Sequence, residues 1–205
     1  SDRGAVFFIA GDSVLSRRDF LKTALIATGS AFLPATPLLN TTPYVQNLCR
    51  GRASITWKWP ADGLGTVEFS EDLSFSSSVG APVRELLPRE TGLPWPVYIY
   101  RADLPNLSPS TNYHYRVFLD DGLLAAGDGF RFGTAGARAF NFLVFGDCGL
   151  GTRPQYDIAQ RMLGENAALA LITGDVVYMS GSYVEYEERF FPYYSDMMRS
   201  VPFFP

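Results

Sequence analysis

Two short apolar runs, each ending abruptly in Gly-Asp, constrain the fold of this chain more than any other feature. The first run, 140–145, leads into Asp147, and the second, 168–173, leads into Asp175. Between them, residues 150–165 have the spacing of an amphipathic helix. Strand, helix, strand with both strands apolar throughout predicts a parallel βαβ unit buried on both faces. The apolar stripe of the helix is expected to comprise Ile158, Met162 and Leu163.

The two aspartates are predicted to meet. The carboxyl ends of neighbouring parallel strands lie side by side at one edge of a sheet, so Asp147 and Asp175 should converge there. Tyr178 follows shortly after and reaches the same place if its loop curls back. Taken singly, each residue also has an ordinary structural role: an aspartate after a strand can cap the next helix, and a tyrosine can pack as a buried aromatic ring. Together, two carboxylates and a phenolate form a hard oxygen set that suits Fe(III) or another strongly Lewis-acidic ion.

Residues 41–136 follow a two-residue period instead. Apolar and polar side chains alternate in several short stretches that are separated by Pro, Gly, Ser and Asp. Evenly spaced short strands with such turns predict a small antiparallel β-sandwich. The alternating stretches are 53–59, 67–69, 98–104, 113–117 and 130–132.

One strand of this region carries a more specific signal. Tyr113 opens the strand directly after the turn 108–110, as in the tyrosine corner of sandwich domains, where the hydroxyl bonds back to the preceding loop. The stretch 107–117 resembles the penultimate strand of a fibronectin type III domain. His114, the one histidine of the chain, is expected on the outward face, solvated rather than bound to a metal. No residue pattern in residues 41–136 indicates a catalytic or ligand-binding site. We expect this region to pack beside, or present, the region that follows it.

Residues 1–40 look like a targeting segment. Arg17 and Arg18 precede Phe-Leu-Lys and a weakly apolar stretch, 23–33, which is shorter than the roughly 20 residues of a membrane span. This order resembles a twin-arginine export signal. It implies the twin-arginine export machinery as a partner, a periplasmic or extracellular location, and no membrane association of the mature form. The alternative is the first turn of an ordinary amphipathic helix.

Charge and cysteine content narrow the partners further. The net charge is −4 and no basic stripe is present, which argues against nucleic acid as a partner. Cys49 and Cys148 either pair in an oxidising compartment or remain free thiols. Strand-end alternation turns Cys148 away from Asp147, so we expect it to pack rather than react.

The combination of motifs points to a family. Gly146-Asp147-x-Gly149, followed by Gly174-Asp175-x-x-Tyr178, resembles the first two metal motifs of purple acid phosphatases. The junction after the β-region and the aromatic stretch near the end are also similar, so the resemblance spans about residues 41–205. It implies a multidomain fold: an all-β fibronectin type III-like sandwich (41–136), followed by the first βαβα part of an α/β metallophosphoesterase sandwich (138–205).

The resemblance also implies a chemistry. In that family the residue matching Asp147 binds Fe(III), the one matching Asp175 bridges both metals, and the one matching Tyr178 binds iron and gives the purple colour. The second metal is Fe, Zn or Mn. A metal-bound hydroxide attacks small-molecule phosphate monoesters. The expected function is therefore that of a secreted acid phosphatase, a hydrolase acting on phosphate esters.

Part of the family's ligand set is not among these 205 residues. The Gly-Asn-His motif and three later metal-binding histidines are missing. The resemblance therefore implies a fragment that binds metal poorly and has little activity by itself. Two alternatives stay open: an exported alkaline phosphatase or phosphodiesterase of the related Fe-dependent branch, and a non-catalytic secreted β-sandwich module. The Gly-Asp-x-Gly form of the first motif favours the purple acid branch.

Overall fold

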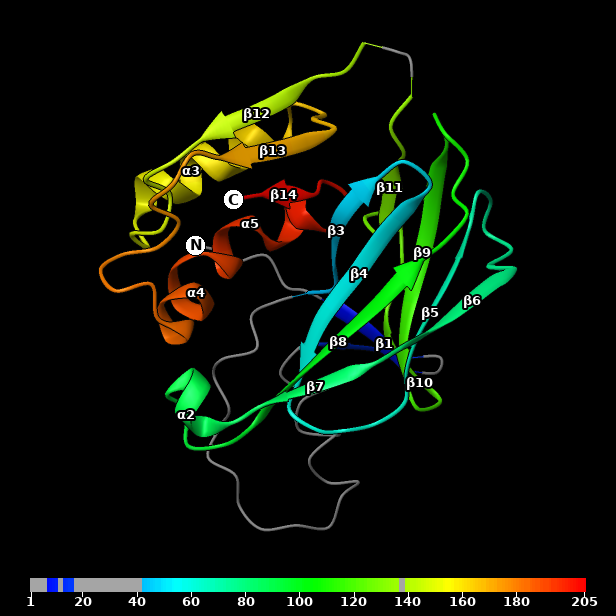
Figure 1. Cartoon of the computed structure of the whole chain (residues 1–205), viewed down its shortest axis with the longest axis horizontal. Helices are drawn as coiled ribbons and strands as arrows, with labels where there is room; N and C mark the ends of the chain where they lie inside the picture. Colours follow the sequence, from blue (N-terminus) through cyan, green and yellow to red (C-terminus); the bar gives the residue numbers. More distant parts are fainter. Residues whose placement is uncertain (1–6, 11–12, 17–41, 137–138) are drawn as a thin grey trace.

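The structure, a computed structural model, describes residues 7–10, 13–16, 42–136 and 139–205 (Figure 1). Near the amino terminus, β1 (Phe7–Ala10) pairs antiparallel with β2 (Ser13–Ser16). The paired arginines and the apolar stretch of the predicted export signal lie outside the described residues. No helix among the described residues is both long and apolar enough to cross a membrane.

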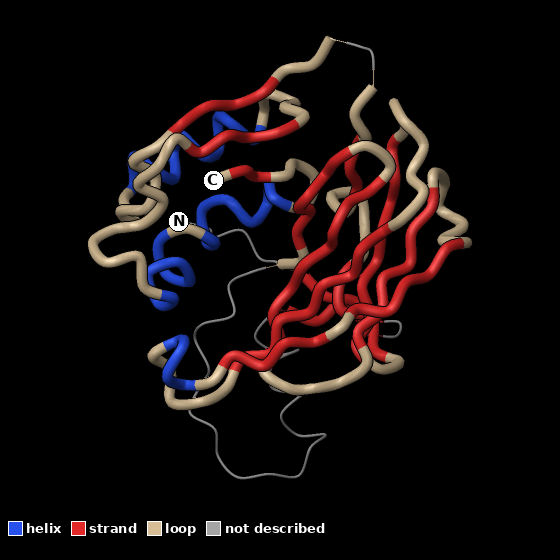
Figure 2. The backbone as a smooth tube through the Cα atoms, viewed as in Figure 1, coloured by secondary structure: helices blue, strands red, loops and turns tan. Residues whose placement is uncertain are grey.

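Residues 44–133 form two antiparallel sheets (Figure 2). Side chains from both sheets form one hydrophobic core. One sheet has the order β3-β4-β8-β7, and the other has the order β10-β9-β5-β6, with β11 also paired to β9. The first sheet comprises β3 (Tyr44–Cys49), β4 (Arg52–Trp59), β7 (Val83–Leu86) and β8 (Val97–Leu104). The second comprises β5 (Gly65–Ser70), β6 (Ser77–Ala81), β9 (Asn112–Leu119), β10 (Gly122–Ala125) and β11 (Arg131–Gly133). A short helix, α2 (Pro88–Thr91), lies between β7 and β8.

The alternation seen in the sequence places large side chains between these sheets. Trp57 of β4 and Tyr100 of β8 stack with ring centroids 5.1 Å apart, and both are fully buried. The predicted tyrosine corner is present, because the backbone N–H of Ser108 donates to the Tyr113 hydroxyl over 2.9 Å. The antiparallel sandwich predicted from the two-residue period is therefore found. We refer to this region, residues 42–136, as the sandwich.

One strand departs from the expected half-buried pattern. Lys58 of β4 was expected on a polar outer face, yet its side chain is only 5% exposed and forms an ion pair with Glu187 of α4 (Tyr183–Arg189). Its ammonium group also lies 3.7 Å from the ring centroid of Phe191. The outer face of β4 is thus an interface with the helices of the second region rather than a solvated surface.

Residues 139–205 form a three-stranded parallel sheet with helices, which we call the α/β region. Its strands, in the order β12-β13-β14, are β12 (Phe142–Phe145), β13 (Leu169–Ile172) and β14 (Phe203–Phe204). Its helices are α3 (Arg153–Leu163), α4 and α5 (Phe191–Met198). Phe145 pairs with Ile172, so β12 and β13 end level with each other. The predicted parallel βαβ unit is present.

The parallel sheet is covered on one face only, within the described residues. Ala170 and Ile172 of β13 pack in one core with side chains from α3 and α5. On the opposite face Phe142 is 53% exposed and Val144 is 55% exposed. The expectation that both faces would be buried is therefore wrong for the described part of the chain, because α3 and α5 supply only one covering layer.

The buried stripe of α3 also differs from the expected one. Ile158 and Leu163 are exposed, whereas Gln155, Ala159 and Met162 are buried. The stripe was predicted from the spacing of apolar residues alone. That criterion does not find Gln155, whose buried side-chain amide is hydrogen-bonded through both its nitrogen and its oxygen. That glutamine lies beside the candidate site.

Candidate metal centre

The structure brings Asp147, Asp175 and Tyr178 together. Asp147 follows β12, Asp175 follows β13, and the Tyr178 hydroxyl reaches back to both carboxylates. It lies 2.9 Å from Asp175 Oδ2 and is also hydrogen-bonded to Asp147 Oδ1. Both aspartates are exposed to solvent, and Tyr178 is half-buried. Three oxygen-bearing side chains from two loops therefore share one solvent-accessible spot at the carboxyl edge of the parallel sheet.

The backbone at both aspartates has the same uncommon conformation. Asp147 has φ of 51° and Asp175 has φ of 49°, so both lie in the left-handed region. Aspartate tolerates this region better than most residues, because its short polar side chain forms local hydrogen bonds. Such backbone conformations gather at functional sites, where surrounding contacts hold them. Here each one turns the chain sharply at a strand end and directs a carboxylate toward the same place.

The two loops are held against each other by backbone contacts. The N–H of Cys148 donates to the carbonyl of Asp175 over 3.2 Å, and the N–H of Tyr178 donates to the carbonyl of Gly149 over 3.1 Å. A Cβ atom at position 149 would lie only 2.1 Å from the carbonyl oxygen of Val176. The motif glycine is therefore required by the close approach of the two loops, which in turn brings the aspartates together.

Cys148 lies in the core rather than in the site. Its side chain is 5% exposed, and burial raises the pKa of its thiol to about 11, which leaves it an unreactive packing residue. Cys49 is exposed on the sandwich, and both cysteines are free thiols. His114 lies half-buried on β9 of the sandwich, in a different region from the three oxygen-bearing side chains.

The electrostatics of the site fit a cation. The hydrogen bond from the phenol to Asp147 raises the pKa of Tyr178, with burial and the hydrogen bond to Asp175 acting in the same direction. The phenol is consequently neutral here and bridges two carboxylates that would otherwise repel each other. A hard cation could take the place of that proton, because carboxylate and phenolate oxygens are the donors it prefers. The third donor of this site is a tyrosine; the described residues contain no cluster of three or more His, Cys, Asp or Glu side chains that could hold a metal.

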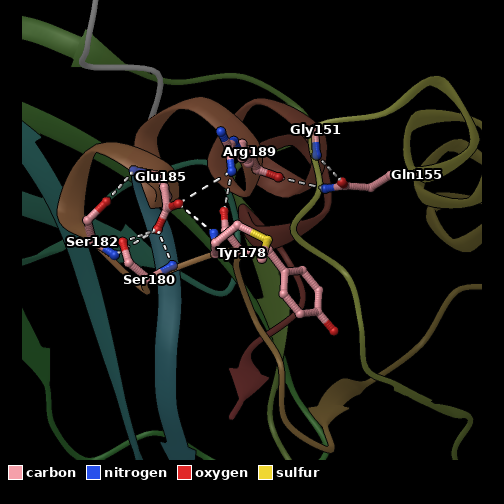
Figure 3. Close-up of polar contacts among 8 residues, drawn as sticks. Gly151, Gln155, Tyr178, Ser180, Ser182, Glu185 and Arg189 are labelled. Atoms are coloured by element: carbon pink, nitrogen blue, oxygen red, sulfur yellow. Dashed lines mark hydrogen bonds and ion pairs between the residues drawn. The ribbon is translucent and has the colours of Figure 1, made fainter.

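Three residues that were not predicted from the sequence support the site: two contact the Tyr178 loop, and the third links one of them to the loop after β12 (Figure 3). They are Glu185 and Arg189 of α4, and Gln155 of α3. One sequence signal was available: Ser182 with Glu185 three residues later is the pattern of a capping box, and the structure has that box. The hydrogen bond between Gln155 and the backbone of Arg189 joins residues 34 positions apart and has no local signal.

Comparison with known proteins places the fold. No family model matches the chain, and no curated protein matches it. Among solved structures, the chain resembles the purple acid phosphatase PPD1 from yellow lupin (Lupinus luteus) seeds, with a TM-score of 0.66 and 16% sequence identity. The match covers 79% of this chain and 34% of that one. The fold is shared with a purple acid phosphatase.

A second solved structure is similar in the same way. The structure of PhoD matches with a TM-score of 0.51 and 15% identity, over 84% of this chain and 39% of that one. At these identities the likeness concerns the fold. The chain spans between a third and two fifths of the length of these two structures.

Proposed function

We propose that this chain is part of a di-metal phosphoesterase of the purple acid phosphatase type, which hydrolyses phosphate monoesters. The observation that carries the proposal is the convergence of Tyr178, Asp147 and Asp175 on one exposed spot, in a fold shared with a purple acid phosphatase. Within this proposal, the sandwich corresponds to a fibronectin type III-like domain, and the α/β region corresponds to the first part of a metallophosphoesterase domain.

The three oxygen donors define where the metals would bind. Asp147 and Tyr178 would hold Fe(III), and Asp175 would be shared with a second divalent ion, Fe, Zn or Mn. When bound, such ions supply Lewis acidity toward the phosphate oxygens and generate a nucleophile from water at neutral pH. The chain's own contribution is orientation: the left-handed backbone at both aspartates fixes the carboxylates, and the Tyr178 oxygen carries the proton that must leave when it becomes an anionic ligand.

Export belongs to the same proposal. We infer a periplasmic or extracellular phosphoesterase that uses the twin-arginine machinery, on the basis of Arg17, Arg18 and the mild apolar stretch that follows. Replacing both arginines by lysine should block export of a chain carrying this segment. Unchanged export after that replacement would contradict the proposed twin-arginine signal, but it would not bear on the proposed metal site.

A related activity is the second candidate. The likeness to PhoD favours an exported alkaline phosphatase or phosphodiesterase of the Fe-dependent branch. The substrate decides between the two: an aryl phosphate monoester should be the better substrate for the first candidate, and a diester hydrolysed at alkaline pH for the second.

Iron binding tests the site directly. Fe(III) added in excess, to offset the weak binding expected of an incomplete ligand set, should produce a visible absorption band from phenolate-to-iron charge transfer. Tyr178→Phe should abolish the band, whereas Tyr156→Phe, which changes an exposed tyrosine on α3, should leave it intact. A band that persists in Tyr178→Phe would contradict the ligand assignment. In a protein that carries this chain with the remaining ligands, hydrolysis of the aryl phosphate monoester that is unchanged by Asp175→Asn would contradict the proposed function.

A further inference from the structure

The carboxylate of Glu185 fastens the loop that follows Tyr178. Its two oxygens accept hydrogen bonds from the backbone N–H groups of Met179 at 2.6 Å, Ser180 at 3.1 Å and Ser182 at 3.0 Å. The Ser180 hydroxyl also donates to it over 2.9 Å. The side chain is only 14% exposed, so these donors replace most of its water. One side chain of α4 thus fixes the backbone of the loop carrying the candidate ligand.

Arg189 and Gln155 continue this set of contacts across the site. The guanidinium of Arg189 donates to the carbonyl oxygen of Tyr178 and lies 3.4 Å from Glu185. The Gln155 amide nitrogen donates to the carbonyl of Arg189 over 2.6 Å, and its oxygen accepts from the N–H of Gly151 over 2.8 Å. Figure 3 shows these contacts as one connected set. The set joins the loop after β13 to the loop after β12.

The stem of Arg189 adds a packing contact to the polar ones. Gly151 has φ of 75°, and a Cβ atom there would lie 3.1 Å from the Arg189 Cγ. The arginine stem therefore occupies the space beside the loop backbone, while its head reaches Tyr178. Replacing the head alone, and keeping the stem, separates the two contributions.

We infer that Glu185, Arg189 and Gln155 are positioning residues, which hold the Tyr178 phenol over the two aspartates before a metal binds. The inference deepens the proposed function and rests on it. Residues that support ligands from behind reduce the ordering that the cation must impose, and their loss typically weakens metal binding by about 10–100-fold. Each acts through backbone groups: Glu185 and Arg189 bind the backbone of the loop that carries Tyr178, and Gln155 binds the backbone of Gly151 and Arg189.

Arg189→Met is the decisive variant, because it keeps the stem and removes the guanidinium. In the metal-free chain, amide hydrogen exchange at Tyr178 and Ser180 should become about tenfold faster, as expected for the loss of one charge-assisted hydrogen bond. Fe(III) affinity, read from the visible band, should fall about 10–100-fold while the unfolding midpoint of the sandwich is unchanged. Arg189→Lys should partly restore the slow amide exchange and the Fe(III) affinity. Arg153→Met, on an arginine that is 79% exposed, is the matched control and should change neither.

Gln155→Met keeps the inference testable if Arg189→Met unfolds the α/β region. It should speed exchange at Gly151 and weaken Fe(III) binding, with Glu185 and Arg189 intact. Parent-like exchange in both loops, or parent-like Fe(III) affinity in both variants, would overturn the inference. If the proposed function is wrong, the results differ: the visible band persists in the Tyr178→Phe variant. The exchange measurements still show, independently of iron, whether the three residues hold the loops.

Discussion

The two regions of the chain bury their sheets to different extents. In the sandwich, each sheet covers the other, and Val117 at the centre of β9 has no exposed surface. In the α/β region, helices cover one face of the parallel sheet, and Val144 of β12 is 55% exposed on the other. The candidate site lies at the edge of the less covered sheet. Stability is therefore expected to be uneven, with the sandwich as the more stable unit and the site-bearing loops opening more readily.

The interface between the regions compensates for part of this difference. The Tyr115 hydroxyl of β9 donates to the carbonyl of Arg199 over 2.8 Å, and the ring of Tyr44 lies 5.9 Å from that of Phe191. The Lys58–Glu187 ion pair lies in the same interface, with side chains 5% and 0% exposed. The sandwich thus serves as a surface against which α4 and α5 are fixed.

The largest effect is expected at this ion pair. Burial lowers the pKa of Lys58, and the neighbouring Glu187 carboxylate opposes that shift by favouring the charged ammonium. Lys58→Met would remove the cation and leave a buried carboxylate, which should cost about 3–5 kcal/mol in the free energy of urea unfolding. Lys58→Met/Glu187→Gln should recover most of this loss. A single variant that costs less than about 1 kcal/mol would show that the pair does not hold the regions together.

The same pair shows where sequence reasoning stops. Alternation along 53–59 correctly separated the two faces of β4, but it could not show what covers the second face, because Glu187 is 129 residues away. The site was easier to predict, because Asp147 and Asp175 each come directly after an apolar run, and the ends of neighbouring parallel strands lie side by side. The role of Gln155 was not predictable, because it depends on two backbone groups that only the tertiary fold brings near.

A glycine in each region gives the second comparison. Gly149→Ala would place a Cβ atom 2.1 Å from a backbone oxygen, so the two site loops would have to separate. We expect a loss of about 3 kcal/mol, the upper end of the usual cost of overpacking. Gly80→Ala in β6 meets nothing within 4 Å and should stay within about 0.5 kcal/mol of the parent. Equal unfolding midpoints for the two variants would contradict the close approach of the loops.

Matched valines test the difference in burial. Val117→Thr introduces a hydroxyl into the closed core of the sandwich and should cost about 1–2 kcal/mol. Val144→Thr makes the same change on the uncovered face of β12 and should alter stability by less than about 0.5 kcal/mol. Thermal unfolding of both variants provides the measurement. A Val144→Thr loss as large as that of Val117→Thr would mean that the face is covered in solution, for example by a second copy of the chain.

The smallest effect is a pH dependence confined to the α/β region. Hydrogen bonds from the backbone N–H of Ser182, and then from Ser180 and Met179, lower the pKa of Glu185 to about 2 from its ordinary value of 4.5. Below about pH 4.5 Glu185 binds a proton in the unfolded chain but not in the folded chain. Its contribution to stability therefore decreases as the pH falls, and it is lost below about pH 2. Glu185→Gln should flatten this decline, as measured by amide exchange in the site loops between pH 5 and pH 2, with β9 amides as the internal reference. An identical decline in the parent and the variant would show that Glu185 does not hold the loop through its charge.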